Sequence, residues 1–338
     1  MSHSTRRREL LFLMFWRRDA VDSLLIAAES GKEKAVRHCL KKRNVDLEIS
    51  DEHGNSALFL ASRSGHAAIV KLLIKHGADV TRTNKNGRSP LFAACCYGRS
   101  TAARELLEGG ASVQQADKLG ETALYAACQN GFEYCARLLL DRGAAVNQAS
   151  NKGASPLYVV SRKGHESLAR LLLDHGASVN QAANDGASPL YVASRKGHAP
   201  LARLLIERGA AVEQATNDGE GPLLVAYRNG HVECEELLLR NGRSRGTSRD
   251  TVLNAAIYGL ATRSRNCGAA AAQKHGVDVA QTTAFSLWVA CLNACCCCAR
   301  LLLDCGVGMK QSADNCTMPL HVATRFGYDA PVLSFYYF

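Results

Sequence analysis

The chain has 338 residues, of which 47% are hydrophobic, and it contains no long low-complexity tract, as is typical of a soluble folded protein. Lysine and arginine outnumber aspartate and glutamate by 41 to 31, and the net charge of +10 favours anionic partners, although no run of aromatic and basic residues indicates a dedicated nucleic-acid module. The 14 cysteines are not spaced as a disulfide framework and no secretory signal with a clean cleavage site is seen, so we expect the cytoplasm, or alternatively the nucleus.

Residues 1–18 lie outside the pattern that organises the rest of the chain. Arginines at positions 6–8 and 17–18 flank an apolar run, Leu10–Trp16. This run is far shorter than the ~20 residues that a membrane-spanning helix needs. We expect an amphipathic helix that covers the edge of the following fold. The alternative is a helix that binds a membrane surface or serves in targeting.

Residues 51–242 repeat with a period of 33 residues, and residues 153–185 and 186–218 are identical at 24 of 33 positions. Three sets of glycines and one set of leucines keep this step: Gly54, Gly87, Gly120, Gly153, Gly186 and Gly219; Gly65, Gly98, Gly131, Gly164, Gly197 and Gly230; Gly77, Gly110, Gly143, Gly176, Gly209 and Gly242; Leu58, Leu91, Leu124, Leu157, Leu190 and Leu223. The chain is therefore interpreted as a series of short units rather than as two globular domains.

The unit that begins at Gly153 predicts a first short helix. Ser155 is a favourable helix N-cap, and Pro156 suits the first helical position, where its missing N–H costs nothing. Gly164 is expected to end this helix. A second helix with apolar residues at helical spacing is expected from about Glu166.

The second helix is expected to end at Gly176, and residues 177–185 are polar and extended before a tight turn at Asn184-Asp185-Gly186. Helices of about two turns are marginal when isolated in water. One unit cannot bury its own apolar face, so the units must stack on their neighbours.

The repeated motif resembles the ankyrin repeat, a unit of 33 residues with S/T-P-L-x-x-A, then G-H, then L-L-x-x-G-A-x-V-N. Ser-Pro-Leu begins at Ser89, Ser155 and Ser188, a late copy reads Met318-Pro319-Leu320-His321-Val322-Ala323, and Gly-His occurs at Gly65, Gly164, Gly197 and Gly230. The resemblance implies an all-α repeat solenoid, in which helix-turn-helix units with β-hairpin or turn tips are stacked.

One position departs from the family pattern. The histidine expected after Pro-Leu is replaced in most units, by Phe59, Phe92, Tyr125, Tyr158, Tyr191, Leu224 and Trp288. We expect the rings to pack within the stack, with each tyrosine hydroxyl bonded to a nearby acceptor. A row of tyrosines that binds a ligand is the alternative.

The ends of the chain are less regular than its middle. Residues 19–242 are interpreted as about seven repeats, of which the first is divergent. Residues 243–282 are interpreted as a degenerate or inserted repeat that begins with a loop, Arg243–Asp250. Residues 283–338 hold about one and a half further repeats, the last of them truncated.

Cys295-Cys296-Cys297-Cys298 is the most conspicuous cluster of possible metal ligands. Adjacent residues on a helix point about 100° apart, so at most two of these thiolates could face one metal ion, whereas a structural zinc site needs four ligands. Cys298 also takes the place of Cys135 in an earlier unit. We expect a drifted helix of a degenerate repeat, with metal binding or redox sensing as the alternative.

No catalytic arrangement is evident. The chain has no P-loop, no G-x-S-x-G, no H-E-x-x-H and no kinase signature, so we expect a non-enzymatic protein without cofactor or metal. The histidines that recur at the repeat period are expected to be structural: His66, His165, His198 and His231. Asn147 and Asn180 are of a type that the family can hydroxylate, but we expect hydrogen-bonded turn residues.

The resemblance implies that the partner-binding groove is lined by the two residues before each glycine that ends a first helix, and by the tips, which carry Lys152, Asp185 and Asp218. The groove positions are Arg63 and Ser64, Cys96 and Tyr97, Gln129 and Asn130, Arg162 and Lys163, Arg195 and Lys196, Arg228 and Asn229, and Arg325 and Phe326. Of these, the candidate binding residues on the concave face are Arg63, Tyr97, Gln129, Arg162, Lys163, Arg195, Lys196 and Arg228.

Basic residues dominate three neighbouring units at these positions: Arg162, Lys163, Arg195, Lys196 and Arg228. Arginine suits bidentate contacts with carboxylates, so one interpretation is a groove for an acidic peptide or an acidic protein surface. The other is a solvated face that a recent duplication has copied.

The sequence therefore predicts a monomeric, non-enzymatic scaffold or adaptor that binds a partner protein through the concave face of an ankyrin-repeat stack. The alternative is a basic scaffold that associates with anionic membrane or nucleic acid. Binding to a polyanion should weaken steeply with salt, whereas an interface with an apolar core should not.

Overall fold

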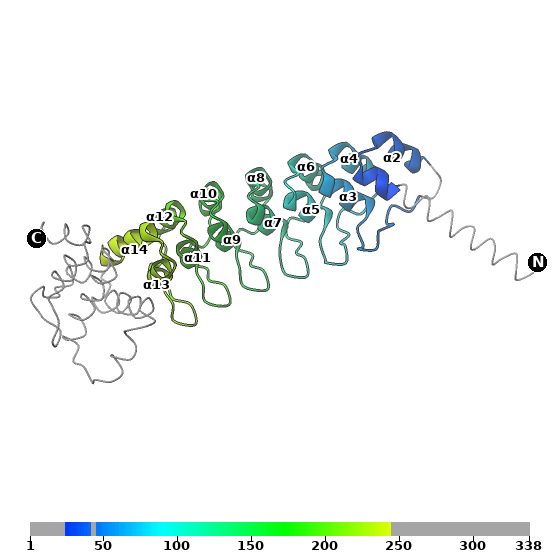
Figure 1. Cartoon of the computed structure of the whole chain (residues 1–338). Coiled ribbons are helices and arrows are strands. Elements are labelled where there is room, and N and C mark those ends of the chain that lie inside the picture. The colour runs from blue at the N-terminus through cyan, green and yellow to red at the C-terminus, as the bar shows by residue number, and fades with distance from the viewer. Residues whose placement is uncertain (1–23, 42–44, 245–338) are drawn as a thin grey trace, which may run out of the picture. The chain divides into compact units, whose positions relative to one another are not determined.

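The computed structural model describes residues 24–41 and 45–244 (Figure 1). The chain divides into two units, Met1–Pro189 and Leu190–Phe338, and each is described by itself. The predictions for residues 1–18, for the cysteines at 295–298 and for the repeats in 283–338 lie outside the described residues.

The first unit is a series of helix pairs. Residues 24–29 and α2 (Glu33–Leu40) make up the divergent first repeat. The regular pairs are α3 (Ala57–Ser64) with α4 (Ala67–Lys75), α5 (Pro90–Cys96) with α6 (Ser100–Glu108), α7 (Ala123–Asn130) with α8 (Glu133–Asp141), and α9 (Pro156–Lys163) with α10 (Glu166–Asp174). The first helices pack on one another in one row and the second helices in another (Figure 1). The predicted all-α class of helix-turn-helix repeats is confirmed.

A side-chain hydroxyl begins each regular first helix of the first unit. The caps are Ser56, Ser89, Thr122 and Ser155, and each accepts a hydrogen bond of 3.1–3.2 Å from the backbone N–H three residues later. Such a bond satisfies one of the N–H groups that a helix start leaves without a partner. Gly164 ends α9 with a φ of 81°, in the left-handed region that favours glycine. The predicted start and end of this helix are both confirmed.

The aromatic rings that replace the family histidine are buried in the first unit. Phe59, Phe92, Tyr125 and Tyr158 are 3–7% exposed. Burial raises the pKa of Tyr125, and a hydrogen bond with the Ser150 side chain partly opposes this shift. The structure thus agrees with packing rather than with a solvent-facing row of tyrosines.

The tips are turns. Among the described residues, two isolated antiparallel β-bridges occur, Ser50 with Ser56 and Ala116 with Thr122. Backbone hydrogen bonds of 2.8–3.0 Å run from one tip to the next in the first unit: Lys85 N–H to His53 O, Lys118 N–H to Asn86 O, Asn151 N–H to Leu119 O, and Asn184 N–H to Lys152 O. Neighbouring tips are therefore joined through the main chain.

The second unit is described over α11 (Pro189–Lys196, whose first residue closes the first unit), α12 (Ala199–Glu207), α13 (Pro222–Asn229) and α14 (Val232–Ser244). Within this unit α13 and α12 both pack on α14. None of the helices described in either unit is long and apolar enough to pass through a membrane.

The predicted end of the last regular helix is wrong. A loop was expected to begin at Arg243, but α14 continues to Ser244. In earlier repeats the residue after the glycine in the place of Gly242 is an alanine, such as the buried Ala210, whose N–H bonds back to Leu205 O. Arg243 follows Gly242 in place of this alanine, and the helix continues past the glycine.

Candidate partner-binding surface

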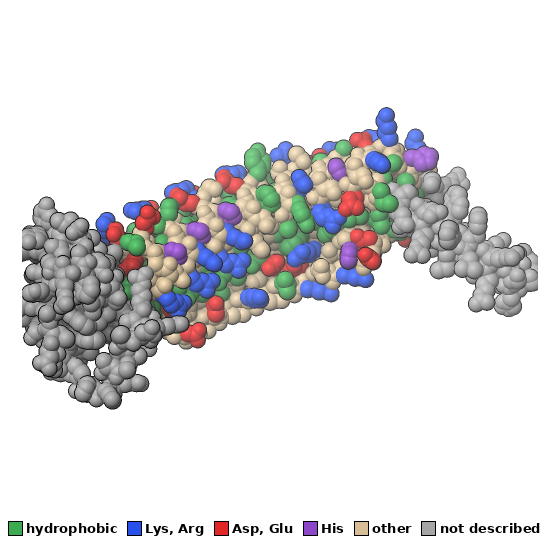
Figure 2. Space-filling model, viewed as in Figure 1, with side chains coloured by type: hydrophobic (Ala, Val, Ile, Leu, Met, Phe, Trp, Pro, Cys, Tyr) green, Lys and Arg blue, Asp and Glu red, His purple; other side chains and the backbone are tan. Residues whose placement is uncertain are grey.

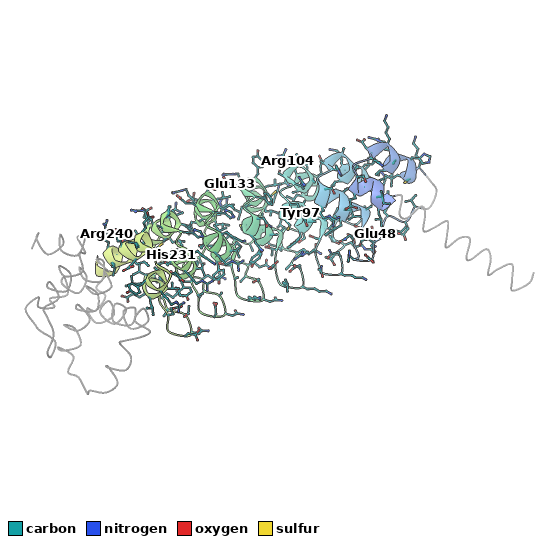
Figure 3. The ribbon with its side chains drawn as sticks, viewed as in Figure 1. Glu48, Tyr97, Arg104, Glu133, His231 and Arg240 are labelled. Atoms are coloured by element: carbon teal, nitrogen blue, oxygen red, sulfur yellow. The ribbon has the colours of Figure 1, made fainter. Side chains whose placement is uncertain are left out.

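The predicted binding residues in the described range all lie at the ends of first helices. Arg63 ends α3, Tyr97 caps α5, Gln129 lies in the last turn of α7, Arg162 and Lys163 end α9, Arg195 and Lys196 end α11, and Arg228 lies in the last turn of α13. Tyr97 is 52% exposed at its helix end (Figure 3).

Arg63 already has an acidic partner in the first unit. Its guanidinium forms a 2.5 Å ion pair with Glu29 of the preceding repeat. Its carbonyl oxygen accepts a 3.3 Å hydrogen bond from Nε of Arg99 in the following repeat. Arg63 therefore links three successive repeats, and its charge is compensated.

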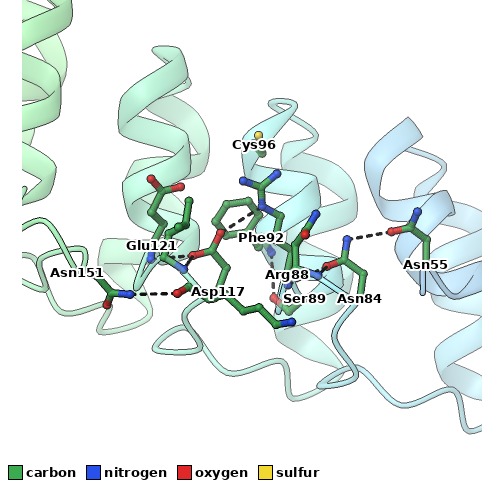
Figure 4. Close-up of polar contacts among 12 residues, drawn as sticks. Asn55, Asn84, Arg88, Ser89, Phe92, Cys96, Asp117, Glu121 and Asn151 are labelled. Carbon is green, nitrogen blue, oxygen red and sulfur yellow. Dashed lines mark hydrogen bonds and ion pairs between the residues drawn. The ribbon is translucent and has the colours of Figure 1, made fainter. Parts of the chain in front are cut away.

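A second arginine in the first unit forms a cluster that sequence reasoning missed (Figure 4). Arg88 Nε donates a 3.2 Å hydrogen bond to Asp117, whose side chain is 1% exposed. The same guanidinium lies 4.9 Å from the ring centroid of Phe92. Asp117 also accepts the backbone N–H groups of Leu119 and Glu121, which fixes the tip. Arg88 is thus held against the first helix rather than offered to a partner.

Glu121 gives the first unit an acidic group close to the predicted basic residues. Burial raises its pKa, the charge of Asp117 adds to this, and the positive charges of Arg88, Arg162 and Lys152 oppose it. Arg162 therefore lies within electrostatic reach of a carboxylate, whereas the exposed Lys163 beside it makes no ion pair with any described residue.

In the second unit, the carboxylate of Glu220 contacts α11 and α13, the two helices that carry predicted binding residues. Glu220 is 16% exposed at its side chain and forms a two-point ion pair with Arg228, at 2.5 Å from Nη1 to Oε1 and 3.1 Å from Nη2 to Oε2. The hydroxyl of Tyr191 donates a short hydrogen bond to the same carboxylate. Burial, this hydrogen bond and the charge of Glu220 raise the pKa of Tyr191 to about 12.

Two further cations in the second unit are not compensated in this way. The Arg195 guanidinium lies 5.7 Å from the ring centroid of Tyr191, a cation–π geometry, and forms no ion pair with a described residue. Lys196 is exposed and also has no ion pair in the described part of the chain. In Figure 2, basic side chains gather over α11 and α13.

Two of the recurring histidines, His66 and His231, and Asn147 bond to a neighbouring repeat, which agrees with the structural roles expected of them. His66 Nε2 donates to the carbonyl of Glu29 at 3.0 Å, and His231, at the start of α14 (Figure 3), donates to that of Arg195 at 3.1 Å. The Asn147 amide donates to the carbonyl of Gly176 and accepts from the N–H of Ser178, so it holds the turn after the next second helix.

The described cysteines fit a structural role. Cys95, Cys128 and Cys135 are buried at 0–1% exposure, as predicted for core positions. Burial raises the pKa of Cys128, which keeps this thiol protonated and unreactive at neutral pH. Within residues 24–41 and 45–244, no three side chains of His, Cys, Asp or Glu are grouped so that they could hold a metal ion.

Comparison with known proteins identifies the class. The family model for ankyrin repeats in three copies matches residues 24–117, 80–150, 110–183, 144–216 and 179–250, together more than half of the chain. The chain therefore belongs to the ankyrin-repeat family. Ankyrin repeats are generally modules for protein–protein interaction, and proteins built from them are generally non-enzymatic.

Two solved structures extend this likeness. The ankyrin repeat domain of human ASB11 is 27% identical, with a TM-score of 0.59, over 64% of this chain and 96% of that one. The ankyrin repeat domain of Bcl-3, described as a unique member of the IkappaB protein family, is 29% identical, with a TM-score of 0.57, over 64% of this chain and 97% of that one. No curated protein sequence matches the chain.

Proposed function

We propose that this protein is a monomeric, non-enzymatic scaffold or adaptor of the cytoplasm or nucleus that binds an acidic segment of a partner protein. The binding surface consists of the ends of the first helices, the face that the family uses as its concave groove. Its members are Arg63, Tyr97, Gln129, Arg162, Lys163, Arg195, Lys196 and Arg228.

The observation that carries the proposal is the set of cations at these positions without a carboxylate partner. Lys163, Arg195 and Lys196 form no ion pair with any described residue. Elsewhere, some exposed arginines on second helices are paired within their own helix, as Arg137 is with Glu133 and Arg170 with Glu166. Uncompensated positive charge at a recurrent position of an interaction module suits a negatively charged ligand.

The Arg228–Glu220 pair supports carboxylate recognition at this surface. Nη1 contacts Oε1 and Nη2 contacts Oε2, which is the bidentate geometry by which arginine recognises planar acids. A lysine offers a flexible point charge instead, so Lys163 and Lys196 contribute attraction more than geometry.

Tyr97 and Gln129 give the same surface a less charged part in the first unit. Tyr97 exposes 52% of its area, and an exposed tyrosine combines apolar contact area with a hydroxyl donor. Tyrosine and arginine are also the residues most enriched at the energetic centres of protein interfaces. We therefore assign Tyr97 to apolar contacts and the basic residues to acidic groups of the partner.

The proposal is tested with a fluorescein-labelled peptide of eight glutamates and the full chain, by fluorescence anisotropy. The affinity of the triple variant Arg162→Glu, Arg195→Glu and Arg228→Glu for the peptide should fall by about tenfold or more, and tenfold corresponds to ~1.4 kcal/mol. The matched control reverses Arg104, Arg142 and Arg203, which belong to second helices or their caps and form no ion pair with described residues. The control should retain affinity within about twofold.

Two outcomes would overturn the proposal. Equal loss in both triple variants would show that net charge alone attracts the peptide. Binding of duplex DNA or anionic vesicles with a steep salt dependence, and no binding of the peptide, would favour the polyanion-binding alternative.

A further inference from the structure

We infer that Glu220 is an internal competitor: its carboxylate occupies the arginine and tyrosine donors that an acidic group of the partner would otherwise use. The inference rests on the proposed function and concerns the regulation of the same surface. It lies entirely within the second unit.

The first support is the completeness of the Glu220 site. The carboxylate receives two bonds from Arg228 and one from the Tyr191 hydroxyl. Its backbone is fixed as well, because Thr216 Oγ1 accepts the Glu220 N–H at 3.2 Å and Thr216 N–H donates to the Glu220 carbonyl at 3.0 Å. The chain therefore presents this carboxylate from a rigid turn, at small entropic cost.

The second support is that the repeat fold does not require an acid at this position. The residue that follows the tip glycine is Asn55, Arg88, Glu121, Ala154, Ala187 or Glu220 in successive repeats. Ala187 comes after residues 153–185 and Glu220 after residues 186–218, and these two blocks are identical at 24 of 33 positions. Only Glu121 and Glu220 are acidic at this position, so the acid is not part of the repeat motif. Of the partners of Glu220, Arg228 is a proposed ligand-binding residue and Tyr191 lies on the same helix as Arg195 and Lys196.

The third support is the exposure of the pair. Arg228 is 52% exposed at its side chain, so water and salt screen its attraction to Glu220. An acidic group of a partner can therefore reach Arg228 from solvent and exchange with Glu220. When Glu220 leaves, three basic residues of this unit, Arg195, Lys196 and Arg228, face the ligand together with the Tyr191 hydroxyl.

The test compares the full-length wild type with Glu220→Gln in the anisotropy assay with the eight-glutamate peptide. The amide keeps the size of the side chain but removes the negative charge, so affinity should rise roughly three- to tenfold. Glu213→Gln is the matched control, because Glu213 is an exposed acid of the same unit without an ion pair among the described residues. It should raise affinity less than about twofold.

A second variant locates the effect. Glu220→Gln combined with Arg228→Ala should lose the gain, because the inference assigns the gain to the release of Arg228. Persistence of the full gain in this double variant, or an equal gain in Glu213→Gln, overturns the inference. Thermal melting of each variant confirms that the second unit remains folded.

The outcomes also separate this inference from the proposed function. If the wild type binds the peptide, the triple reversal abolishes binding and Glu220→Gln binds as the wild type does, only the inference fails. If neither the wild type nor Glu220→Gln binds the peptide, the proposed acidic partner fails and the inference fails with it.

Discussion

A single side-chain hydroxyl caps each regular first helix of the first unit. In the second unit, α13 lacks such a hydroxyl. The N-cap of α13 is Gly221, which has an extended backbone with φ −89° and ψ 168°, close to the −82° and 164° of Ser89. Gly221 makes no side-chain capping bond, and a Cβ built on it would meet nothing within 4 Å. A serine at this position therefore has both the room and the backbone geometry to cap α13.

We predict that Gly221→Ser stabilises the second unit by about 0.5–1 kcal/mol. The serine hydroxyl can accept a backbone N–H of α13, and the loss of glycine reduces the conformational freedom of the unfolded chain. Urea unfolding followed by circular dichroism measures the change. Gly221→Ala separates the two causes, because alanine restricts the unfolded chain but cannot cap. An equal gain from alanine and serine would contradict the role of the hydroxyl.

At the scale of the element, some glycines that follow first helices lie close to a side chain of the next repeat. Gly98 has a φ of 68°, and a Cβ added there would lie 2.6 Å from the ring of Phe132 in the next repeat. Gly110, after a second helix, has a φ of 90° but would meet nothing within 4 Å. The two glycines share the left-handed conformation and differ in the contact.

We predict that Gly98→Ala destabilises the protein more than Gly110→Ala does. Both substitutions carry the ~1–2 kcal/mol cost of a left-handed side-chain residue, and only the first also displaces an aromatic ring. The free energies of unfolding of the two variants measure the difference. In a Phe132→Ala background the clash is removed, so Gly98→Ala should then cost about as much as Gly110→Ala. A difference that persists without the ring would contradict this explanation.

The local elements could be predicted from sequence because short-range rules govern them. Ser155, Pro156 and Gly164 define α9 through a cap, a preset φ and a left-handed end, and none of these depends on distant residues. The rule failed at Gly242, which is followed by Arg243 rather than by the alanine of earlier repeats, and α14 continues to Ser244. A glycine therefore predicts a helix end only together with the residue after it.

The side-chain clusters of the candidate surface were harder to predict. Arg88 with Asp117, and Tyr191 with Glu220, each join residues 29 positions apart in adjacent repeats. Both pairs use the positions that vary between repeats, so a common motif does not contain them. The only indication in the sequence was that the residue type after the tip glycine changes between repeats. This change indicates which residues could form a cluster, but it does not indicate which residues they contact. Arg63 and Arg228 were correctly placed at helix ends, but their acidic partners, Glu29 and Glu220, were not foreseen.

At the scale of the whole molecule, stability depends on contacts between neighbours. In the first unit α3 packs on α5, α5 on α7 and α7 on α9, so each of these repeats is stabilised by the repeat beside it. Residues 1–18, which lie outside the described range, are predicted to cover the edge of the first repeat.

We predict that deletion of residues 1–18 lowers the melting temperature of the protein. The apolar run of this segment would no longer bury the surface of the first repeat. Differential scanning calorimetry measures the shift. A variant with alanine at Arg6, Arg7 and Arg8 keeps the apolar run and should melt as the wild type does. Unchanged stability after the deletion, together with an altered location in cells, would favour the targeting alternative.

The main-chain bonds between tips restrict how the length of this protein can change during evolution. In the first unit Lys85, Lys118, Asn151 and Asn184 each donate to a carbonyl 32 residues earlier. Loss or gain of one amino acid in a tip would shift donors away from acceptors on both sides. Duplication of a complete 33-residue stretch preserves every such bond, and the two blocks at 153–218, with 24 identical positions, have the appearance of that event. Because these bonds involve no side chains, each new copy can then diverge at its surface without any cost to its alignment with the others.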